Sequence, residues 1–92
     1  VHHDAVLGRT SDGAGPVAAR TLAELRAADA GARFTPDDGR TFPFRAAGVR
    51  VPTLDEVLGA WPDVPVLVEI KVAQASAEVR RVLDRHRAAG RA

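Results

Sequence analysis

The sequence contains no cysteine, which excludes disulfide bonds and metal sites built from thiolates. No apolar run approaches the roughly 18 residues that a membrane-spanning helix needs, so we expect no transmembrane segment. Basic residues form no run interleaved with aromatic residues, and we expect no nucleic-acid partner. The motifs Gly-x-Ser-x-Gly and His-x-x-x-His and a phosphate-cradling glycine loop before a helix are also absent, so the chain carries none of these standard sites.

The remaining composition is that of one small folded domain of 92 residues, 46% hydrophobic and 27% charged. The net charge of +1 comes from 13 basic and 12 acidic residues, a balance that argues against wrapping around a polyanion. Lys71 is the single lysine among the basic residues. A compact ammonium group there is a weak hint of function, and chance explains it equally well. No feature of the sequence specifies an oligomeric state or a compartment.

Two helices are predicted from capping boxes, in which a threonine and the glutamate three residues later satisfy free backbone N–H groups. Thr21 and Glu24 begin a helix over about residues 21–30, which Gly31 would end. Thr53 and Glu56 begin a second helix of about two turns. The spacing of capping and apolar residues therefore indicates two short amphipathic helices.

A third helix is predicted from Ser76, which can cap it, to Gly90, which can end it. Its arginines lie on one side, and its apolar face consists of Val79, Val82, Leu83 and His86. We therefore interpret the last of these as a core or interface histidine.

The segment between the first two helices, about residues 32–51, fits neither a helix nor a strand. Pro36 and Pro43 exclude a central strand. Three phenylalanines occur here: Phe34, Phe42 and Phe44. We predict an ordered insertion loop whose aromatic side chains either plug a core or line a pocket.

Residues 64–70, Val-Pro-Val-Leu-Val-Glu-Ile, are almost continuously apolar, which is typical of a parallel strand buried on both faces. Residues 1–3 are interpreted as the end of another strand. Strands that alternate with helices predict an α/β fold with a parallel sheet and right-handed crossovers. Because two strands can neither close a barrel nor form a covered sheet, we expect a piece of a larger α/β domain.

Chemistry-bearing side chains gather where the predicted strands end, and we expect the two groups to lie side by side. His3 precedes Asp4 at the opening of a loop, which suits an imidazole that titrates near neutrality. Because side chains alternate along a strand, His2 points the other way and is assigned to packing or the surface.

Glu69 and Lys71 share one face of the predicted strand. A carboxylate buried on that face would need a cation, because isolated buried charges are costly. The cation is either Lys71, in a structural ion pair, or a divalent metal ion. Solvent exposure of Glu69 is the third interpretation.

Five short motifs occur in order: His3-Asp4, Leu7-x-Arg9-Thr10, Gly13-x-Gly15, Pro52-Thr53-Leu54-x-Glu56-Val57-Leu58 and Glu69-Ile70-Lys71. In this order and at these intervals they resemble the glycerophosphodiester phosphodiesterase family, including its insertion before the Pro-Thr-Leu helix. The resemblance covers nearly the whole chain. It implies that residues 1–92 form one partial domain, an early-middle part of a (β/α)8 TIM barrel with parallel strands, crossover helices and the insertion at about 32–51.

The resemblance also implies metal-dependent hydrolysis of glycerophosphodiesters, which are small-molecule substrates, to glycerol 3-phosphate and an alcohol, in lipid and glycerol metabolism. His3 matches a general acid/base histidine. Glu69 matches a carboxylate ligand of Ca²⁺ or Mg²⁺, and Lys71 matches a lysine that offsets phosphate charge. In the family the insertion lies over the glycerol end of the substrate, but no motif carries that role to the three phenylalanines.

The chain also departs from the family pattern. Gly8 replaces an aspartate and Ser11 replaces a threonine in the first loop. The opening His-Arg-Gly with the partner histidine and the Glu-x-Asp pair of metal carboxylates do not occur. We therefore expect the 92-residue chain to be inactive by itself. The alternative is a non-catalytic α/β interaction or assembly module derived from a truncated barrel. A third possibility, another lipid-directed phosphodiesterase barrel, is opposed by the insertion and by the Pro-Thr-Leu helix.

Overall fold

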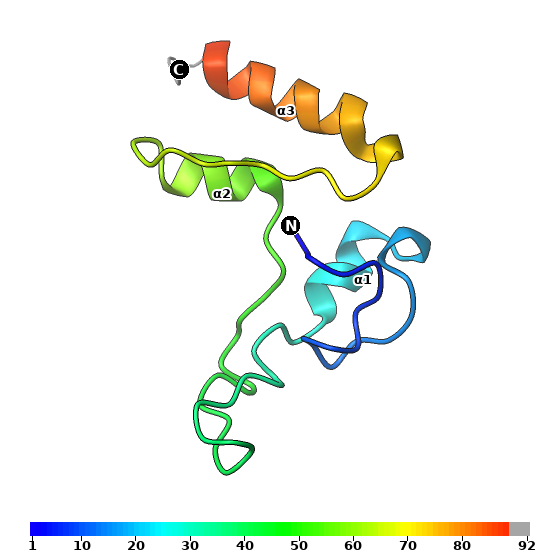
Figure 1. The fold of residues 1–92 in the computed structure, drawn as a ribbon, viewed down its shortest axis with the longest axis vertical. Coiled ribbons are helices and arrows are strands. Elements are labelled where there is room, and N and C mark those ends of the chain that lie inside the picture. The colour runs from blue at the N-terminus through cyan, green and yellow to red at the C-terminus, as the bar shows by residue number, and fades with distance from the viewer. Residues whose placement is uncertain (89–92) are drawn as a thin grey trace. The chain divides into compact units, whose positions relative to one another are not determined.

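The computed structural model describes residues 1–88 and falls into two compact units, Val1–Val51 and Pro52–Ala92, which we describe separately. Their elements are η1 (Val17–Ala19), α1 (Leu22–Ala27), α2 (Leu54–Ala60), η2 (Ala73–Ala75) and α3 (Ser76–Ala88) (Figure 1). Within residues 1–88 no β-strand forms. None of the helices described has the length and hydropathy that crossing a membrane requires.

The first unit begins with a loop that folds back on itself. The backbone N–H of Leu7 donates to the Gly15 carbonyl at 3.0 Å, and the N–H of Val17 donates to the Ala5 carbonyl at 2.9 Å. Gly15 has a φ of +79°, a left-handed conformation that glycine adopts without steric cost. The loop therefore turns sharply and buries Leu7, which is 2% exposed.

The helix α1 starts as its capping box predicts. The Thr21 hydroxyl accepts from the Glu24 N–H at 3.2 Å, and the Thr21 N–H donates to the Glu24 carboxylate at 3.3 Å. The helix ends at Ala27, before the predicted Gly31, because Ala28 already has an extended backbone (ψ 140°). Gly31 instead allows a close approach, since a Cβ there would lie 2.5 Å from the Phe44 carbonyl oxygen.

The insertion, about residues 32–51, contains no helix and no strand, as predicted. Its phenylalanines do not form a buried plug, because Phe34 and Phe44 are 51% and 47% exposed. Their rings instead pack on each other, with centroids 5.4 Å apart. The plug interpretation is therefore wrong for these two residues, since the chain provides too little apolar surface to cover them.

In the second unit α2 and α3 pack against each other. The capping box at the start of α2 is confirmed: the Thr53 hydroxyl accepts from the Glu56 N–H, and the Thr53 N–H donates to the Glu56 carboxylate, both at 3.1 Å. Leu58 of α2 is the best buried large side chain of this unit, 2% exposed. The short helix is thus held by its cap and by one apolar anchor.

The predicted apolar face of α3 is confirmed, because its four members are each partly buried: Val79, Val82, Leu83 and His86. Ser76 is not the cap that we predicted. Its φ of −58° and ψ of −44° are helical, and η2 leads directly into it. The predicted stop at Gly90 lies outside the described residues.

Residues 65–70 lie in neither a helix nor a strand, so the strand predicted over 64–70 is wrong for this chain. Leu67, in its centre, is 98% exposed. The physical reason is that a strand is stabilised by hydrogen bonds to neighbouring strands and by cover on its faces, and the described residues supply neither. Residues 1–3 likewise form no strand, so the predicted parallel sheet has no strand among residues 1–88.

Candidate functional site

His3, Asp4 and Arg9 form a chain of hydrogen bonds at the start of the first unit. His3 Nδ1 lies 2.8 Å from Asp4 Oδ1. Arg9 Nε and Nη2 donate to Asp4 Oδ2 and Oδ1 at 2.5 and 3.0 Å, a bidentate arrangement. Because an ionised carboxylate only accepts, the proton of this imidazole lies on Nδ1, and Nε2 of the neutral ring keeps its lone pair.

Asp4 is held in its charged form. The Arg9 guanidinium, and after it the His3 ring, holds the pKa of the Asp4 carboxyl far below its usual range. The same contact raises the pKa of Arg9. His3 itself is open to solvent, with 72% of its side chain exposed. The imidazole is therefore oriented from one side by a permanent negative charge while its other nitrogen is accessible.

His2 takes a structural place beside this cluster, in agreement with its assignment to packing or the surface. Its Nδ1 donates to the Asp4 carbonyl at 2.8 Å, and its Nε2 lies 3.2 Å from the Thr10 hydroxyl. Both ring nitrogens therefore serve to close the loop. Of the two neighbouring histidines, His3 is the one with an accessible Nε2.

The loop is fastened to the rest of its unit by two aspartates. The Asp12 carboxylate accepts from the backbone N–H of Asp29 at 2.6 Å. Asp29 is only 9% exposed, and its carboxylate accepts from the N–H groups of Gly31 at 3.0 Å and Ala46 at 2.9 Å. The hydrogen bond from Ala46 is the largest cause of the lowered pKa of Asp29. The carboxylates of Asp12 and Asp29 thus join three parts of the unit: the first loop, the residues after α1 and the insertion.

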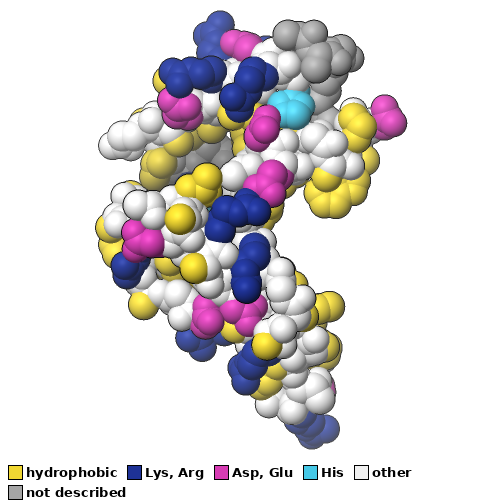
Figure 2. All heavy atoms as spheres, turned by 180° about the vertical axis from the view of Figure 1, so that it is seen from behind, with side chains coloured by type: hydrophobic (Ala, Val, Ile, Leu, Met, Phe, Trp, Pro, Cys, Tyr) yellow, Lys and Arg dark blue, Asp and Glu magenta, His cyan; other side chains and the backbone are white. Residues whose placement is uncertain are grey.

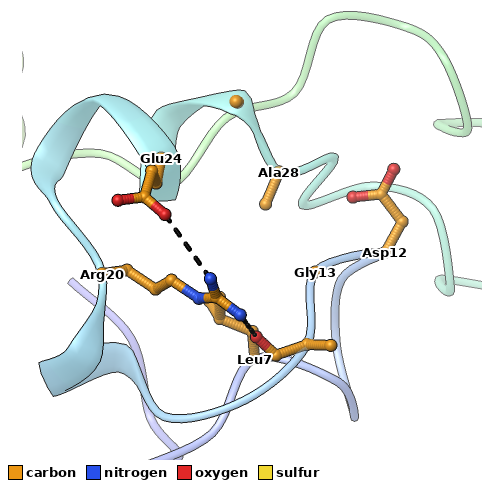
Figure 3. A pocket seen from close by; sticks show the side chains of 8 residues that line it. Leu7, Asp12, Gly13, Arg20, Glu24 and Ala28 are labelled. Atoms are coloured by element: carbon orange, nitrogen blue, oxygen red, sulfur yellow. Dashed lines mark hydrogen bonds and ion pairs between the residues drawn. The ribbon is translucent and has the colours of Figure 1, made fainter.

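A hollow of about 320 Å³ lies between this loop and α1. Figure 3 shows Arg20 reaching across it: Nη2 donates to the Ala14 carbonyl at 2.9 Å, and Nη1 lies 3.5 Å from the Glu24 carboxylate. Leu7, Gly13 and Ala28 line its apolar side. Because the guanidinium already bridges loop and helix, we assign Arg20 to holding the loop.

Glu69 and Lys71 form the ion pair that was one of the open interpretations, with Lys71 Nζ 2.9 Å from Glu69 Oε1. The burial that motivated it is not present, because 73% of the Glu69 side chain is exposed. An exposed pair of this kind contributes little to stability, on the order of 0–1 kcal/mol. Since His3 belongs to the first unit and this pair to the second, their proximity stays a prediction.

The described residues do not by themselves make a site for a metal ion. Among residues 1–88 no group of three or more His, Cys, Asp or Glu side chains could hold one. Glu69 offers a single carboxylate, whereas Ca²⁺ and Mg²⁺ take about six or more oxygen ligands. The role of Glu69 as a metal ligand therefore depends on further ligands that the described residues do not provide.

The role of His3 stays a prediction from the sequence, which did not predict the contacts of Arg9 and Asp29. Arg9 was noted only as part of a motif, and its spacing of five residues from Asp4 has no helical or strand meaning. Asp29 precedes Ala-Gly, and its hydrogen bond to the Gly31 N–H two residues on is an Asx-type turn that could have been expected. Its contact with Ala46, 17 residues away, has no local signal.

Comparison with known proteins gives consistent matches. Residues 1–90 match the model of the glycerophosphoryl diester phosphodiesterase family. An uncharacterized protein of Mycobacterium tuberculosis strain H37Rv is 35% identical over 89 residues, which cover 92% of this chain and 30% of that protein. An uncharacterized protein of strain CDC 1551 is also 35% identical over 89 residues, covering 92% of this chain and 29% of that protein. The chain therefore spans about 30% of the length of the curated relatives it matches.

Proposed function

Because the chain belongs to the glycerophosphoryl diester phosphodiesterase family, we propose that it supplies part of the active site for hydrolysis of glycerophosphodiesters to glycerol 3-phosphate and an alcohol. The observation that carries the proposal is the hydrogen-bond chain from Arg9 through Asp4 to His3. It prepares one imidazole nitrogen for proton transfer. The substrate is a small molecule, in keeping with the family.

His3 acts as a general acid/base through Nε2. Its Nδ1 proton is fixed on Asp4, so Nε2 is the atom that takes a proton from a nucleophile or gives one to a leaving oxygen. Asp4 stabilises the imidazolium that forms, because Arg9 keeps the carboxylate ionised. A positioned acid/base group typically contributes about 10² to 10⁴ in rate.

Lys71 offsets the charge of the phosphate, and Glu69 contributes one carboxylate ligand to a Ca²⁺ or Mg²⁺ site. Their ion pair supports this assignment, because it places a cation and an anion at one exposed point of the chain. When bound, the metal would supply Lewis-acid stabilisation of the phosphoryl oxygens. The remaining ligands belong to parts of the family domain with the Glu-x-Asp pair, which this sequence lacks.

The chain by itself is inactive in this proposal. Phosphate-ester hydrolysis requires accelerations of up to about 10²¹ for monoesters, far beyond one acid/base group. In a larger domain with neighbouring strands, residues 64–70 form a strand of the (β/α)8 barrel. Formation of this strand brings the Glu69–Lys71 pair close to His3. The exposed apolar side chains of Val66 and Leu67 support that assignment, since such residues are normally covered.

A segment exchange tests the proposal. The 89-residue matching segment of the Mycobacterium tuberculosis H37Rv relative is replaced by this chain, and release of glycerol 3-phosphate from glycerophosphocholine is measured with Ca²⁺ or Mg²⁺. We expect activity in the intact relative and in the chimera, and a loss of about 10²-fold or more in the His3→Ala chimera. His2→Ala is the matched control and is expected to keep most of the activity.

Three outcomes would contradict the proposal. A His3→Ala chimera as active as the unmodified chimera would remove the acid/base role. Turnover by the purified 92-residue chain, abolished by EDTA and by His3→Ala, would show instead that the chain is a complete catalyst. An inactive relative with no binding of glycerophosphocholine would favour the non-catalytic module.

A further inference from the structure

The insertion of the first unit presents an aromatic surface to which the proposed function assigns no role. Phe34 and Phe44 pack with ring centroids 5.4 Å apart and planes tilted by 45°. Each nevertheless keeps about half of its surface exposed, 51% and 47%. Two large apolar side chains in contact and exposed together form a continuous patch, which marks an interaction surface more strongly than scattered residues do.

A positive charge follows Phe44 in the same insertion. The guanidinium carbon of Arg45 lies 3.9 Å from the centroid of the Phe42 ring, a cation–π contact. Arg45 Nε also donates to the Ala32 carbonyl at 2.9 Å, which fixes the side chain over the ring. We call the set of Phe34, Phe42, Phe44 and Arg45 the aromatic–arginine patch.

The patch is held in place by the folded part of its unit. The Ala46 N–H, next to Arg45, donates to the Asp29 carboxylate at 2.9 Å. Gly31 lets the Phe44 backbone approach closely, because any Cβ at that position would lie 2.5 Å from the Phe44 carbonyl oxygen. A surface that is already ordered loses little conformational entropy when it binds.

The charge around the patch selects an anionic partner. Residues 32–51 contain four arginines against two aspartates, and the Asp29 carboxylate, which accepts from the Ala46 N–H, adds a third acidic group near Arg45 and Arg50. One of those aspartates, Asp37, accepts hydrogen bonds from the Thr41 N–H at 2.8 Å and the Thr41 hydroxyl at 2.7 Å, so its charge is partly satisfied within the turn. Figure 2 shows basic and hydrophobic side chains side by side on the insertion, at the lower end of the view.

We infer that the aromatic–arginine patch docks on an anionic phospholipid surface. Half-exposed aromatic rings suit the boundary between headgroups and acyl chains, and arginines pair with lipid phosphates. The ordered apolar pair fits the headgroup boundary, and the surplus of arginine fits the lipid phosphates. The inference goes beyond the proposed hydrolysis, because it concerns where the chain binds and requires no turnover.

Co-sedimentation of the 92-residue chain with vesicles tests the inference. We expect binding to vesicles that contain phosphatidylglycerol and at least about tenfold weaker binding to pure phosphatidylcholine, since each basic residue contributes about fivefold near an anionic surface. Phe34→Ser/Phe44→Ser should weaken binding about tenfold or more, and Arg45→Gln about fivefold. Circular dichroism checks that the helices persist in each variant.

Matched controls lie outside the insertion. Leu22→Ser removes another half-exposed apolar side chain, 56% exposed, and Arg80→Gln removes an arginine whose side chain is 85% exposed. Both should bind like the unmodified chain. No binding to either vesicle, or equal losses in the patch and control variants, would overturn the inference. Displacement by free glycerol 3-phosphate would do the same, because the patch would then take a soluble phosphate.

Quenching of tryptophan fluorescence provides a second measurement, which reports contact between the patch and lipid directly. Trp61 is the single tryptophan, so Phe44→Trp in a Trp61→Phe background places one fluorophore in the patch. Brominated anionic lipids should quench this tryptophan several-fold more than Leu22→Trp in the same background. Equal quenching at the two positions would show that the patch does not enter the lipid.

Discussion

Arg9 and Asp4 form a two-point contact, in which Nε and Nη2 of the arginine donate to the two carboxylate oxygens at 2.5 and 3.0 Å. The carboxylate also holds His3 Nδ1 at 2.8 Å. A planar guanidinium fixes the orientation of the carboxylate as well as its charge, which a lysine at the same position would not do. The orientation of the His3 imidazole therefore depends on Arg9, six positions further along the chain.

The first prediction concerns the tautomer of His3. Asp4→Ala removes the acceptor for Nδ1–H, so we expect the neutral ring to shift toward the Nε2–H form that predominates in free imidazole side chains. Two-dimensional ¹H–¹⁵N NMR of the ring nitrogens measures the two forms directly. Thr10→Val is the control, because it alters only the contact of His2 Nε2. If the His3 ring keeps the same tautomer in Asp4→Ala, then Asp4 does not fix the proton on Nδ1.

The second prediction is a dependence on pH through Asp29. Its pKa is lowered by the hydrogen bond from Ala46, then by that from Gly31, with Arg50 and Arg45 adding to the effect. A lowered pKa in the folded state means that the stabilisation is complete above the ordinary value of 3.8 and is lost as the pH falls through the lower folded value.

Hydrogen exchange at the Ala46 and Gly31 amides measures this effect. We expect protection of both amides near neutrality and its loss well below pH 3.8. In Asp29→Asn the protection should be lower throughout and independent of pH in this range. Retained protection at the lowest pH would show that the carboxylate is not the anchor of the insertion.

The third prediction concerns the start of α2. Thr53→Ala removes the hydroxyl that accepts from the Glu56 N–H at 3.1 Å, and the expected cost is about 1 kcal/mol. Far-ultraviolet circular dichroism during urea unfolding measures it. Thr53→Ser keeps the hydroxyl acceptor and should lower the free energy of unfolding much less. Equal losses in the two variants would show that the lost stability does not come from the cap.

The fourth prediction compares two glycines of the first unit. Gly31→Ala places a Cβ 2.5 Å from the Phe44 carbonyl oxygen, so we expect the insertion to shift and the unit to lose about 1–3 kcal/mol. Gly8→Ala meets its nearest atom at an ordinary 3.7 Å and should be nearly neutral. Chemical unfolding measures both, and equal stabilities would show that the insertion does not pack on Gly31.

The fifth prediction concerns the contact between α2 and α3. His86 Nε2 lies 2.9 Å from Asp55 Oδ1, and Arg85 Nη2 lies 3.5 Å from the same oxygen. A double-mutant cycle with Asp55→Asn and His86→Gln should give a coupling of about 0.2–1 kcal/mol that decreases with salt. A coupling near zero at low salt would show that this pair does not stabilise the second unit.

The sequence correctly predicted features that depend on residues a few positions apart in the chain. The capping boxes at Thr21 and Thr53 located the starts of α1 and α2, because their hydrogen bonds join residues three positions apart. The apolar face of α3 followed from helical spacing for the same reason. The helix α1 ends at Ala27, earlier than its pattern predicts, because Ala28 has an extended backbone that no local motif signals.

For the segment 64–70 the local pattern led to a wrong prediction. Its composition is that of a strand covered on both faces, but composition alone supplies neither the neighbouring strands nor the cover. Leu67 therefore stays 98% exposed, and Glu69 pairs with Lys71 at the surface instead of in an interior. For the site, His3 is a prediction made from its position in the sequence, whereas the contacts of Arg9 and Asp29 are defined only by the folded chain.

The apolar segment around Val66 and Leu67 also bears on stacking between molecules. Short β-branched runs of low charge are templates for cross-β stacking between molecules. Here Pro65 precedes the run and lacks the N–H that a stacked strand would donate, while Glu69 and Lys71 place charges at its other end. Besides the roles proposed for them at the phosphate, we expect these two charges to oppose the stacking of this run between molecules.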